Sequence, residues 1–195
     1  MMSRTSDEVN PRKVLLFSGH MIDAPSRAEP RFPADKEEIA ARAIADTLDR
    51  IAVERGDLAI CGGACGGDLL FAEAALARRL SLAIYLPFEQ DKFLAESVDF
   101  ANADWRQRYF AAKSQSSLHI APRELGPLKA DENPYERNNL WMLQVATGHG
   151  AEKVDFICLW NGAGGDGPGG TQHQMQEVQQ QGGRIHWLDT RQMWT

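Results

Sequence analysis

Short apolar runs alternate with amphipathic stretches along almost the whole chain. The runs carry few charged residues, which is typical of strands that are buried on both faces of a sheet. Turn residues or charged residues bound each run, so each one is predicted as a separate strand. The predicted strands span residues 13–18, 58–61, 82–86, 118–121, 154–160 and 184–188.

Between these runs, apolar residues recur at the spacing of an α-helix. Residues 36–54 form the clearest case, and Asp35 with Glu38 three positions later predicts a capping box at its start. Asn133 followed by Pro134 predicts another helix start, because Asn suits the cap and Pro the first helical position. The remaining predicted helices span about residues 68–79, 91–98, 104–113 and 171–181.

Strands that alternate with helices predict an α/β fold of the Rossmann-like, doubly wound type. We expect a mostly parallel sheet of about six strands, with helices on both faces, because each crossover lays a helix over the sheet. A length of 195 residues suits a single domain, here residues 1–195, with residues 1–12 flexible. The least regular segment, residues 122–133, is predicted as a loop within that domain.

Composition narrows the classes of partner. The formal net charge is -6 at pH 7, which argues against nucleic acid and anionic membranes, since both select basic surfaces. Arg106 and Arg108 form one of the few local positive clusters. No apolar run reaches the length of a membrane span and the first ten residues are polar, so we expect a cytoplasmic protein without a membrane partner.

The three cysteines are Cys61, Cys65 and Cys158, and each lies in or beside an apolar run. An odd number in such positions predicts reduced, buried thiols rather than disulfides. Cys61 and Cys65 lack a second Cys or His pair at zinc-like spacing, so neither a metal nor another cofactor is expected.

Loops that contain glycine follow three of the predicted strands, and two of these loops are glycine-rich. Doubly wound folds bind ligands beyond the carboxyl ends of their strands, glycine lets the backbone approach a ligand closely, and the N–H groups at a helix start favour an anion. A phosphate-bearing ligand is therefore predicted. The candidate ligand-binding residues are Ser18, Gly19, His20, Cys61, Gly62, Gly63, Gly66, Gly67, Asp68, Asn161, Gly167, Pro168, Gly169, Gly170, Thr171 and Arg137.

Several of these residues have two interpretations. Thr171 would place its hydroxyl on a phosphate, or form a capping box with Gln174. Asp68 would contact a ribose hydroxyl, or cap the helix that it begins. His20 would donate to a phosphate or act as a general acid.

Three further residues and one motif also bear on the ligand. Arg27 and Arg31 would form a lid over an anionic ligand, or else face water, and Asn138 beside Arg137 would meet a phosphate or base. Residues 165–170 also match G-x-G-x-x-G, with Asp189 about 20 residues later. That fingerprint belongs to a first βαβ unit, so it does not predict a dehydrogenase here.

Three segments, SGH (18–20), CGGACGGDLLFAEAAL (61–76) and GPGGTQHQMQEV (167–178), resemble the SLOG superfamily of Rossmann-like nucleotide-binding domains. The resemblance spans residues 14–188. The superfamily includes the Lonely Guy (LOG) phosphoribohydrolases, the DprA/Smf DNA-processing proteins and sensor domains of bacterial signalling systems. The resemblance implies nucleotide binding, and its LOG branch implies a homodimer.

LOG hydrolases carry P-G-G-x-G-T-x-x-E, whose Glu helps to cleave an N-glycosidic bond. Pro168-Gly169-Gly170 match its first part, whereas Gln176 stands where the Glu would be. The leading hypothesis is therefore a ligand-sensing module for a nucleotide or nucleotide-derived signal, working beside an effector or signalling protein. The alternative is a nucleotide N-glycosidic hydrolase or transferase that uses Glu177 or Glu73, and a third is DprA-like binding of single-stranded DNA.

Overall fold

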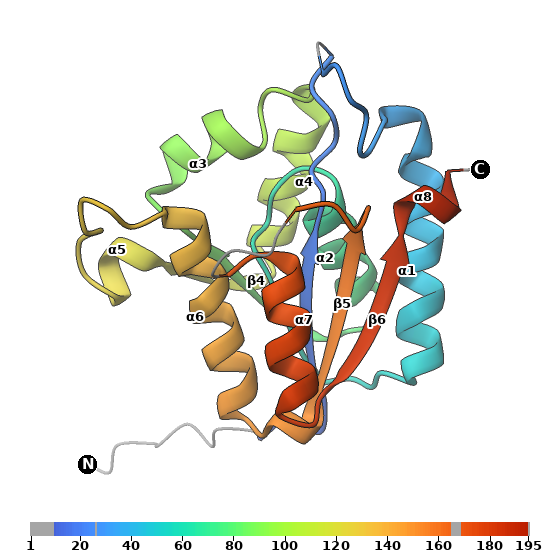
Figure 1. Ribbon diagram of the computed structural model, residues 1–195, viewed down its shortest axis with the longest axis vertical. Helices are drawn as coiled ribbons and strands as arrows, with labels where there is room; N and C mark the ends of the chain where they lie inside the picture. Colours follow the sequence, from blue (N-terminus) through green and yellow to red (C-terminus); the bar gives the residue numbers. More distant parts are fainter. Residues whose placement is uncertain (1–9, 26, 165–168, 195) are drawn as a thin grey trace.

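A computed structural model describes residues 10–25, 27–164 and 169–194 (Figure 1). Within these ranges, six strands form one sheet in the order β4-β3-β2-β1-β5-β6, and every neighbouring pair is parallel. This confirms the predicted doubly wound α/β fold. The strands are β1 (Val14–Gly19), β2 (Leu58–Cys61), β3 (Ser81–Leu86), β4 (Ser116–Ile120), β5 (Val154–Trp160) and β6 (Arg184–Asp189).

All of the helices except α8, which follows β6, lie between successive strands in the chain, as the alternation of patterns predicts. The α-helices are α1 (Glu37–Ile51), α2 (Gly67–Ala77), α3 (Gln90–Ser97), α4 (Ala103–Lys113), α5 (Ala121–Glu124), α6 (Pro134–Gly148), α7 (Thr171–Gln180) and α8 (Thr190–Met193). Two short 3₁₀ helices precede α1 and β5, at η1 (Ala34–Lys36) and η2 (Ala151–Lys153).

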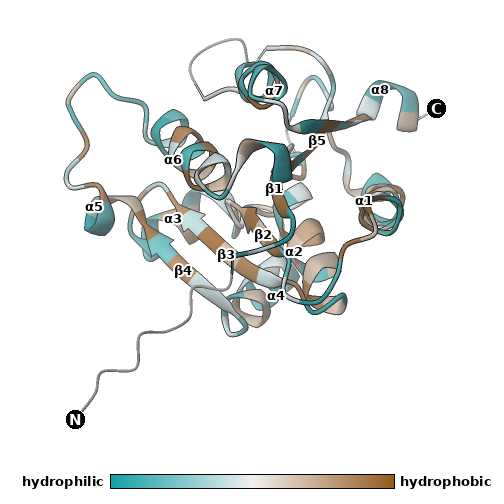
Figure 2. Ribbon diagram, turned by 90° about the horizontal axis from the view of Figure 1, so that it is seen from below, coloured by the Kyte–Doolittle hydropathy of each residue, from teal (hydrophilic) through white to brown (hydrophobic). Residues whose placement is uncertain are grey.

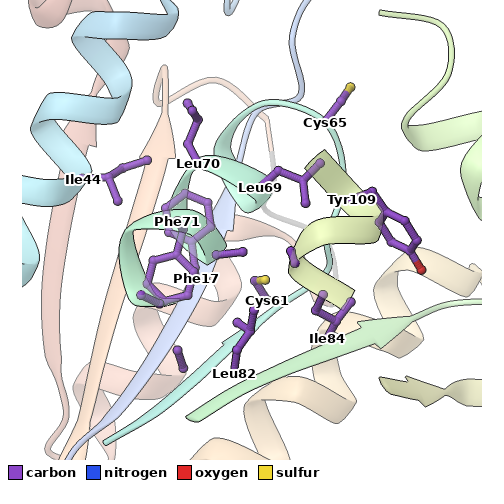
Figure 3. Close-up of a cluster of buried hydrophobic side chains, with 14 of the residues drawn as sticks. Phe17, Ile44, Cys61, Cys65, Leu69, Leu70, Phe71, Leu82, Ile84 and Tyr109 are labelled. Atoms are coloured by element: carbon purple, nitrogen blue, oxygen red, sulfur yellow. The ribbon is translucent and has the colours of Figure 1, made fainter. Parts of the chain in front are cut away.

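Successive residues of β1 point to opposite faces of the sheet, and each face has its own core. Figure 2 shows α6 and α7 over one face of the sheet and α1, α2 and α4 over the other. Leu15 and Phe17 pack with α1, α2 and α4 on one face. In this core the ring of Phe17 stacks on Phe71 of α2, with centroids 4.9 Å apart (Figure 3). Val14 and Leu16 pack with α6 and α7 on the other face. All four of these β1 side chains are fully buried, which explains the continuous apolar run.

The strand order reverses beside β1. The chain lays down β2, β3 and β4 on one side of β1, and then returns to place β5 and β6 on the other side. Doubly wound folds bind ligands outside the carboxyl ends of the strands at this reversal. The loops after β1, β2 and β5 therefore meet at one edge of the sheet.

Local details correct two of the predictions. The capping box of Asp35 and Glu38 is not formed, because Asp35 lies in η1 and α1 begins at Glu37 without a side-chain cap. Residues 121–124 form the short helix α5, which overlaps the start of the segment 122–133 that was predicted as a loop. Arg12, in a segment predicted to be flexible, bonds to Ala52 O and Asp57 Oδ2, both at 2.9 Å. The cap of Asn133 is confirmed, since its side chain accepts the N–H groups of the first turn of α6.

No helix among the described residues combines the length and the apolar character that crossing a membrane requires.

Candidate functional site

A pocket of about 180 Å³ lies between the carboxyl ends of β1 and β2 and the first half of α6. A cavity of roughly 150 Å³ holds a benzene-sized ring. The pocket therefore has room for one planar ring or one sugar, but not for a whole nucleotide. Its lining residues come from five separate segments of the chain: Phe17, Ser18, Gly19, Met21, Gly62, Ala64, Asp68, Pro87, Phe93, Ser97, Tyr135, Asn138, Asn139 and Met142.

Asp68 provides the carboxylate of this pocket. Its Oδ2 accepts the backbone N–H of Ala64 at 3.2 Å, and the N–H of Gly62 also hydrogen-bonds to the carboxylate. Burial raises the pKa of Asp68 to about 7, although the two N–H groups favour its charged form. The predicted helix cap is wrong, because α2 follows Gly66 and no side chain caps it. Asp68 instead binds the loop that precedes its helix.

Two further N–H groups of this glycine-rich loop also have partners within the protein. Cys65 N donates to Ser97 O at 2.9 Å, and Gly67 N donates to His20 O at 3.0 Å. A Cβ on Gly66, whose φ is +90°, would lie 2.5 Å from the backbone N of Ile22. Close packing against the loop after β1 therefore requires glycine here, and the loop does not present a row of free donors to a phosphate.

Asn138 supplies a second acceptor. It lines the pocket, and only 3% of its surface is exposed. Its Nδ2 donates to Tyr85 O at 2.9 Å, which sets the orientation of the amide, because the carbonyl can only accept. Its Oδ1 is buried without a hydrogen-bond partner in the part of the chain that the structure describes. Such an orphaned acceptor costs about 1–3 kcal/mol, and a donor on a ligand would offset that cost.

The start of α7 is held against both β1 and α6. Ser18 Oγ at the end of β1 lies 3.3 Å from Thr171 Oγ1, and Asn139 Nδ2 donates to Gly169 O at 2.9 Å. The predicted capping box is wrong, because Gln174 Nε2 donates to Asn139 O at 3.1 Å and no side chain caps α7. The hydroxyls of Ser18 and Thr171 thus come together as predicted for one site. Gly167 and Pro168 lie outside the described residues.

His20 joins the loops after β1 and β5. The N–H of Asn161 donates to His20 Nε2 at 3.1 Å. Burial, together with the charge of Arg31, lowers the pKa of His20 to about 4, so the imidazole is neutral near pH 7. Nε2 therefore serves as an acceptor within the protein, and His20 is unsuited to act as a general acid near neutral pH.

Several other candidate residues lie outside the lining of the pocket. Arg137 donates from Nη2 to Leu125 O at 2.8 Å and to Gly126 O at 3.1 Å, so its guanidinium fastens the segment after α5. Cys61, Gly63 and Gly170 complete the loops around the pocket without lining it.

The two candidate catalytic carboxylates also lie elsewhere. Glu73 forms a two-pronged ion pair with Arg108, with Oε1 2.6 Å from Nε and Oε2 2.7 Å from Nη2. Glu177 Oε2 accepts from Gln181 Nε2 at 3.4 Å, one turn further along α7. Neither carboxylate lines the pocket.

Arg106, Arg108 and Asp189 each form an ion pair within the protein. Arg106 pairs with Asp99 at 2.6 Å, and Arg108 pairs with Glu73, so the predicted positive cluster is balanced by carboxylates. Asp189, which completes the glycine fingerprint, pairs with Arg191 at 2.8 Å and caps α8.

Sequence reasoning missed most of the α6 and α3 side of the pocket. Tyr135, Asn139, Ser97 and Phe93 line it, yet none of them belongs to a glycine-rich loop. The sequence signal that could have identified these residues is the Asn133 cap, which marks the start of α6. A helix that begins at the carboxyl edge of the sheet has its first turns beside the site. The described residues contain no group of three His, Cys, Asp or Glu placed to hold a metal ion.

A scan against protein-family models and a search of curated proteins both return no match. The functional argument therefore depends on the geometry of the pocket.

Proposed function

We propose that the protein is a binding module for a nucleotide or a nucleotide-derived signal molecule, and that the pocket holds the base or the sugar of that ligand. The observation that carries the proposal is that two residues lining one ring-sized pocket carry hydrogen-bond acceptors: Asp68 has a carboxylate, and Asn138 has an Oδ1 without a partner among the described residues. Ribose hydroxyls, amino groups and ring N–H groups are donors that match these acceptors.

The walls and the position of the pocket support the same class of ligand. Phe17, Phe93 and Met142 supply apolar surface for the faces of a planar ring, which is the usual composition of a small-molecule site. The pocket lies at the edge where doubly wound folds bind their ligands. The resemblance of the flanking loops to the SLOG superfamily favours a nucleotide over other ring compounds.

Binding is favoured over cleavage. The hydrolase alternative needs a carboxylate beside the ligand, but Glu73 is held by Arg108 and Glu177 is on the surface of α7 away from the pocket. Asp68 does line the pocket, but it accepts N–H groups of its own loop. Binding of single-stranded DNA is disfavoured by the net charge of -6.

The proposal is tested first by mass spectrometry of small molecules released from the purified, heat-denatured protein. Isothermal titration calorimetry then follows, with the common nucleosides, their 5′-monophosphates, cyclic nucleotides and ADP-ribose. We expect at least one of them to bind, and Asn138→Ala to weaken its binding by about 10-fold or more, because the variant lacks the acceptor.

Gln144→Ala is the matched control, since Gln144 is exposed on the same helix. It should bind as the wild type does. The proposal fails if no member of the panel binds at millimolar concentration. It also fails if folded Asn138→Ala protein, checked by circular dichroism, binds as tightly as the wild type.

A further inference from the structure

A second pocket, of about 220 Å³, adjoins the first at the carboxyl edge of the sheet. Met21 lines both pockets, so it forms part of the boundary between them. The second pocket is lined by the loop after β1 and by one residue beyond α3: Met21, Ile22, Asp23, Ala24, Arg27, Arg31 and Phe100.

Two arginines and one carboxylate face this second pocket. Asp23 is already engaged on both of its oxygens. Its Oδ1 lies 3.3 Å from Arg27 Nε, and its Oδ2 accepts the backbone N–H groups of Arg31 and Phe32 at 2.8 and 2.9 Å. Asp23 therefore balances Arg27 and organises the loop, so the pocket keeps an excess of one positive charge.

The guanidinium of Arg31 carries that excess. It has no carboxylate within 4 Å among the residues that the structure describes, and its Nε is buried without a hydrogen-bond partner there. Burial, together with the charge of Arg27, lowers the pKa of Arg31, which means that its surroundings disfavour its charge. An anion in the pocket would reverse that effect.

The first pocket lacks the cation that a nucleotide would need. No Lys or Arg belongs to its described lining, and four N–H groups of the glycine-rich loop after β2 are directed to Asp68, Ser97 and His20. A phosphorylated ligand in the first pocket must therefore meet its counter-charge elsewhere. Guanidinium groups suit this role, because their planar array of donors matches the oxygens of a phosphoryl group.

We infer that the second pocket is an anion subsite, in which Arg27 and Arg31 bind a phosphoryl group of the ligand whose ring occupies the first pocket. The inference rests on the proposed function for the position of the ring. It adds the charge class of the ligand and identifies the residues that select for it. Met21, which borders both pockets, lies where the ring and the phosphoryl group would join.

The test compares each nucleoside with its 5′-monophosphate and 5′-diphosphate by calorimetry, and includes inorganic pyrophosphate alone. In the wild type, the phosphorylated form should bind about 10-fold or more tightly than its nucleoside. Arg31→Gln should remove most of this difference, Arg31→Lys should retain part of it, and Arg27→Gln should reduce it. Arg42→Gln, at an exposed position of α1, should leave it unchanged.

The outcomes separate the two proposals. Equal affinity for a nucleoside and its phosphates overturns the subsite and leaves the binding function intact. Pyrophosphate binding that is lost in Arg31→Gln, without binding of any nucleoside, supports the subsite and overturns the ring site. A preference for phosphates that survives in folded Arg31→Gln protein assigns the phosphoryl group to other residues and overturns the subsite. Failure of every probe to bind overturns both.

Discussion

Asp68 Oδ2 accepts the backbone N–H of Ala64 at 3.2 Å, so a carboxylate of the protein itself lies within the glycine-rich loop after β2. The N–H of Gly62 also hydrogen-bonds to that carboxylate. In phosphate-binding loops, such N–H groups are directed at the ligand. Here the N–H groups of Gly62 and Ala64 are directed at the Asp68 carboxylate instead. A phosphate of a ligand must therefore bind elsewhere, and Asp68 is left as an acceptor for neutral donors.

This arrangement predicts a dependence of stability on pH that is specific to Asp68. Its pKa is about 7 in the folded protein, above that of an ordinary carboxyl group. Between about pH 4 and pH 7 the folded protein keeps a proton that the unfolded chain has released, so the free energy of unfolding falls as the pH rises through this window. Asp68→Asn lacks this titration, so its stability should lack this contribution to the fall.

The measurement is urea denaturation of both proteins at intervals from pH 4 to pH 8. The stability of the wild type relative to Asp68→Asn should fall by about 4 kcal/mol across this range, because the pKa is raised by about three units at about 1.4 kcal/mol per unit, and should level off above pH 7. All other titrating groups are common to both proteins and cancel in the difference. Parallel stability curves would show that Asp68 titrates normally.

The close approach of Gly169 to α6 can be tested with a matched pair of substitutions. Gly169 and Gly164 have nearly the same left-handed backbone, with φ of +72° and +70°. A Cβ on Gly169 would lie 2.5 Å from Glu136 O, whereas a Cβ on Gly164 would have nothing within 4 Å. Both substitutions to Ala share the conformational cost of about 1–2 kcal/mol, and only Gly169→Ala adds a steric clash.

We expect Gly169→Ala to lower the free energy of unfolding by about 1–3 kcal/mol more than Gly164→Ala does, because overpacking carries a cost of that size. Denaturation at pH 7 measures the difference. Equal losses would mean that α7 shifts away from α6 freely. In that case the bond from Asn139 to Gly169 does not hold the start of α7.

The fold was predictable because its signals are local. The apolar runs of β2 and β5 give the exact bounds of those strands, and the cap of Asn133 is formed by the N–H groups of Tyr135 and Glu136. The alternation of strands with helices then restricts the topology to a parallel sheet. None of these steps requires knowledge of which distant residues meet.

The site was only partly predictable, because its contacts join distant parts of the chain. Thr171 meets Ser18 across 153 positions, so its apparent capping box with Gln174 is replaced by tertiary contacts. The glycines pointed to the correct edge of the sheet. Their N–H partners, and the orphaned oxygen of Asn138, depend on packing that no local pattern records.

The three cysteines should be unreactive in the native protein. Cys61, Cys65 and Cys158 are buried, and burial raises the pKa of Cys65 and Cys158 to about 12 and that of Cys61 well above its ordinary value (Figure 3 shows Cys61 and Cys65). Because the thiolate is the reactive form, Ellman's reagent should modify none of them quickly at pH 8. In denaturant it should titrate all 3. Fast reaction of any native thiol would contradict their burial.

An ion pair between Asp155 of β5 and Arg184 of β6 lies at the amino ends of these strands, opposite the edge that carries the pockets. Asp155 of β5 is 1% exposed, and its two oxygens accept from Arg184 Nε at 2.8 Å and Nη2 at 2.7 Å, with His186 Nε2 also at 2.8 Å. Burial alone would raise the pKa of Asp155. The hydrogen bonds from Arg184 and His186 outweigh burial and lower the pKa to about 2.

A lowered pKa stabilises the folded protein above the ordinary carboxyl pKa of about 4, and this stabilisation is lost as the pH falls from about 4 to 2. Asp155→Asn should therefore cost about 2–3 kcal/mol at pH 7, less than a fully buried pair would, because the remaining Arg184 is 49% exposed and can be hydrated. The destabilisation caused by Asp155→Asn should disappear near pH 2.

Asp49→Asn, which breaks an exposed pair with Arg78, is the control and should cost far less. Urea denaturation at pH 7, 4 and 2 measures both variants, and equal losses at every pH would show that Asp155 is not held as a carboxylate by these partners.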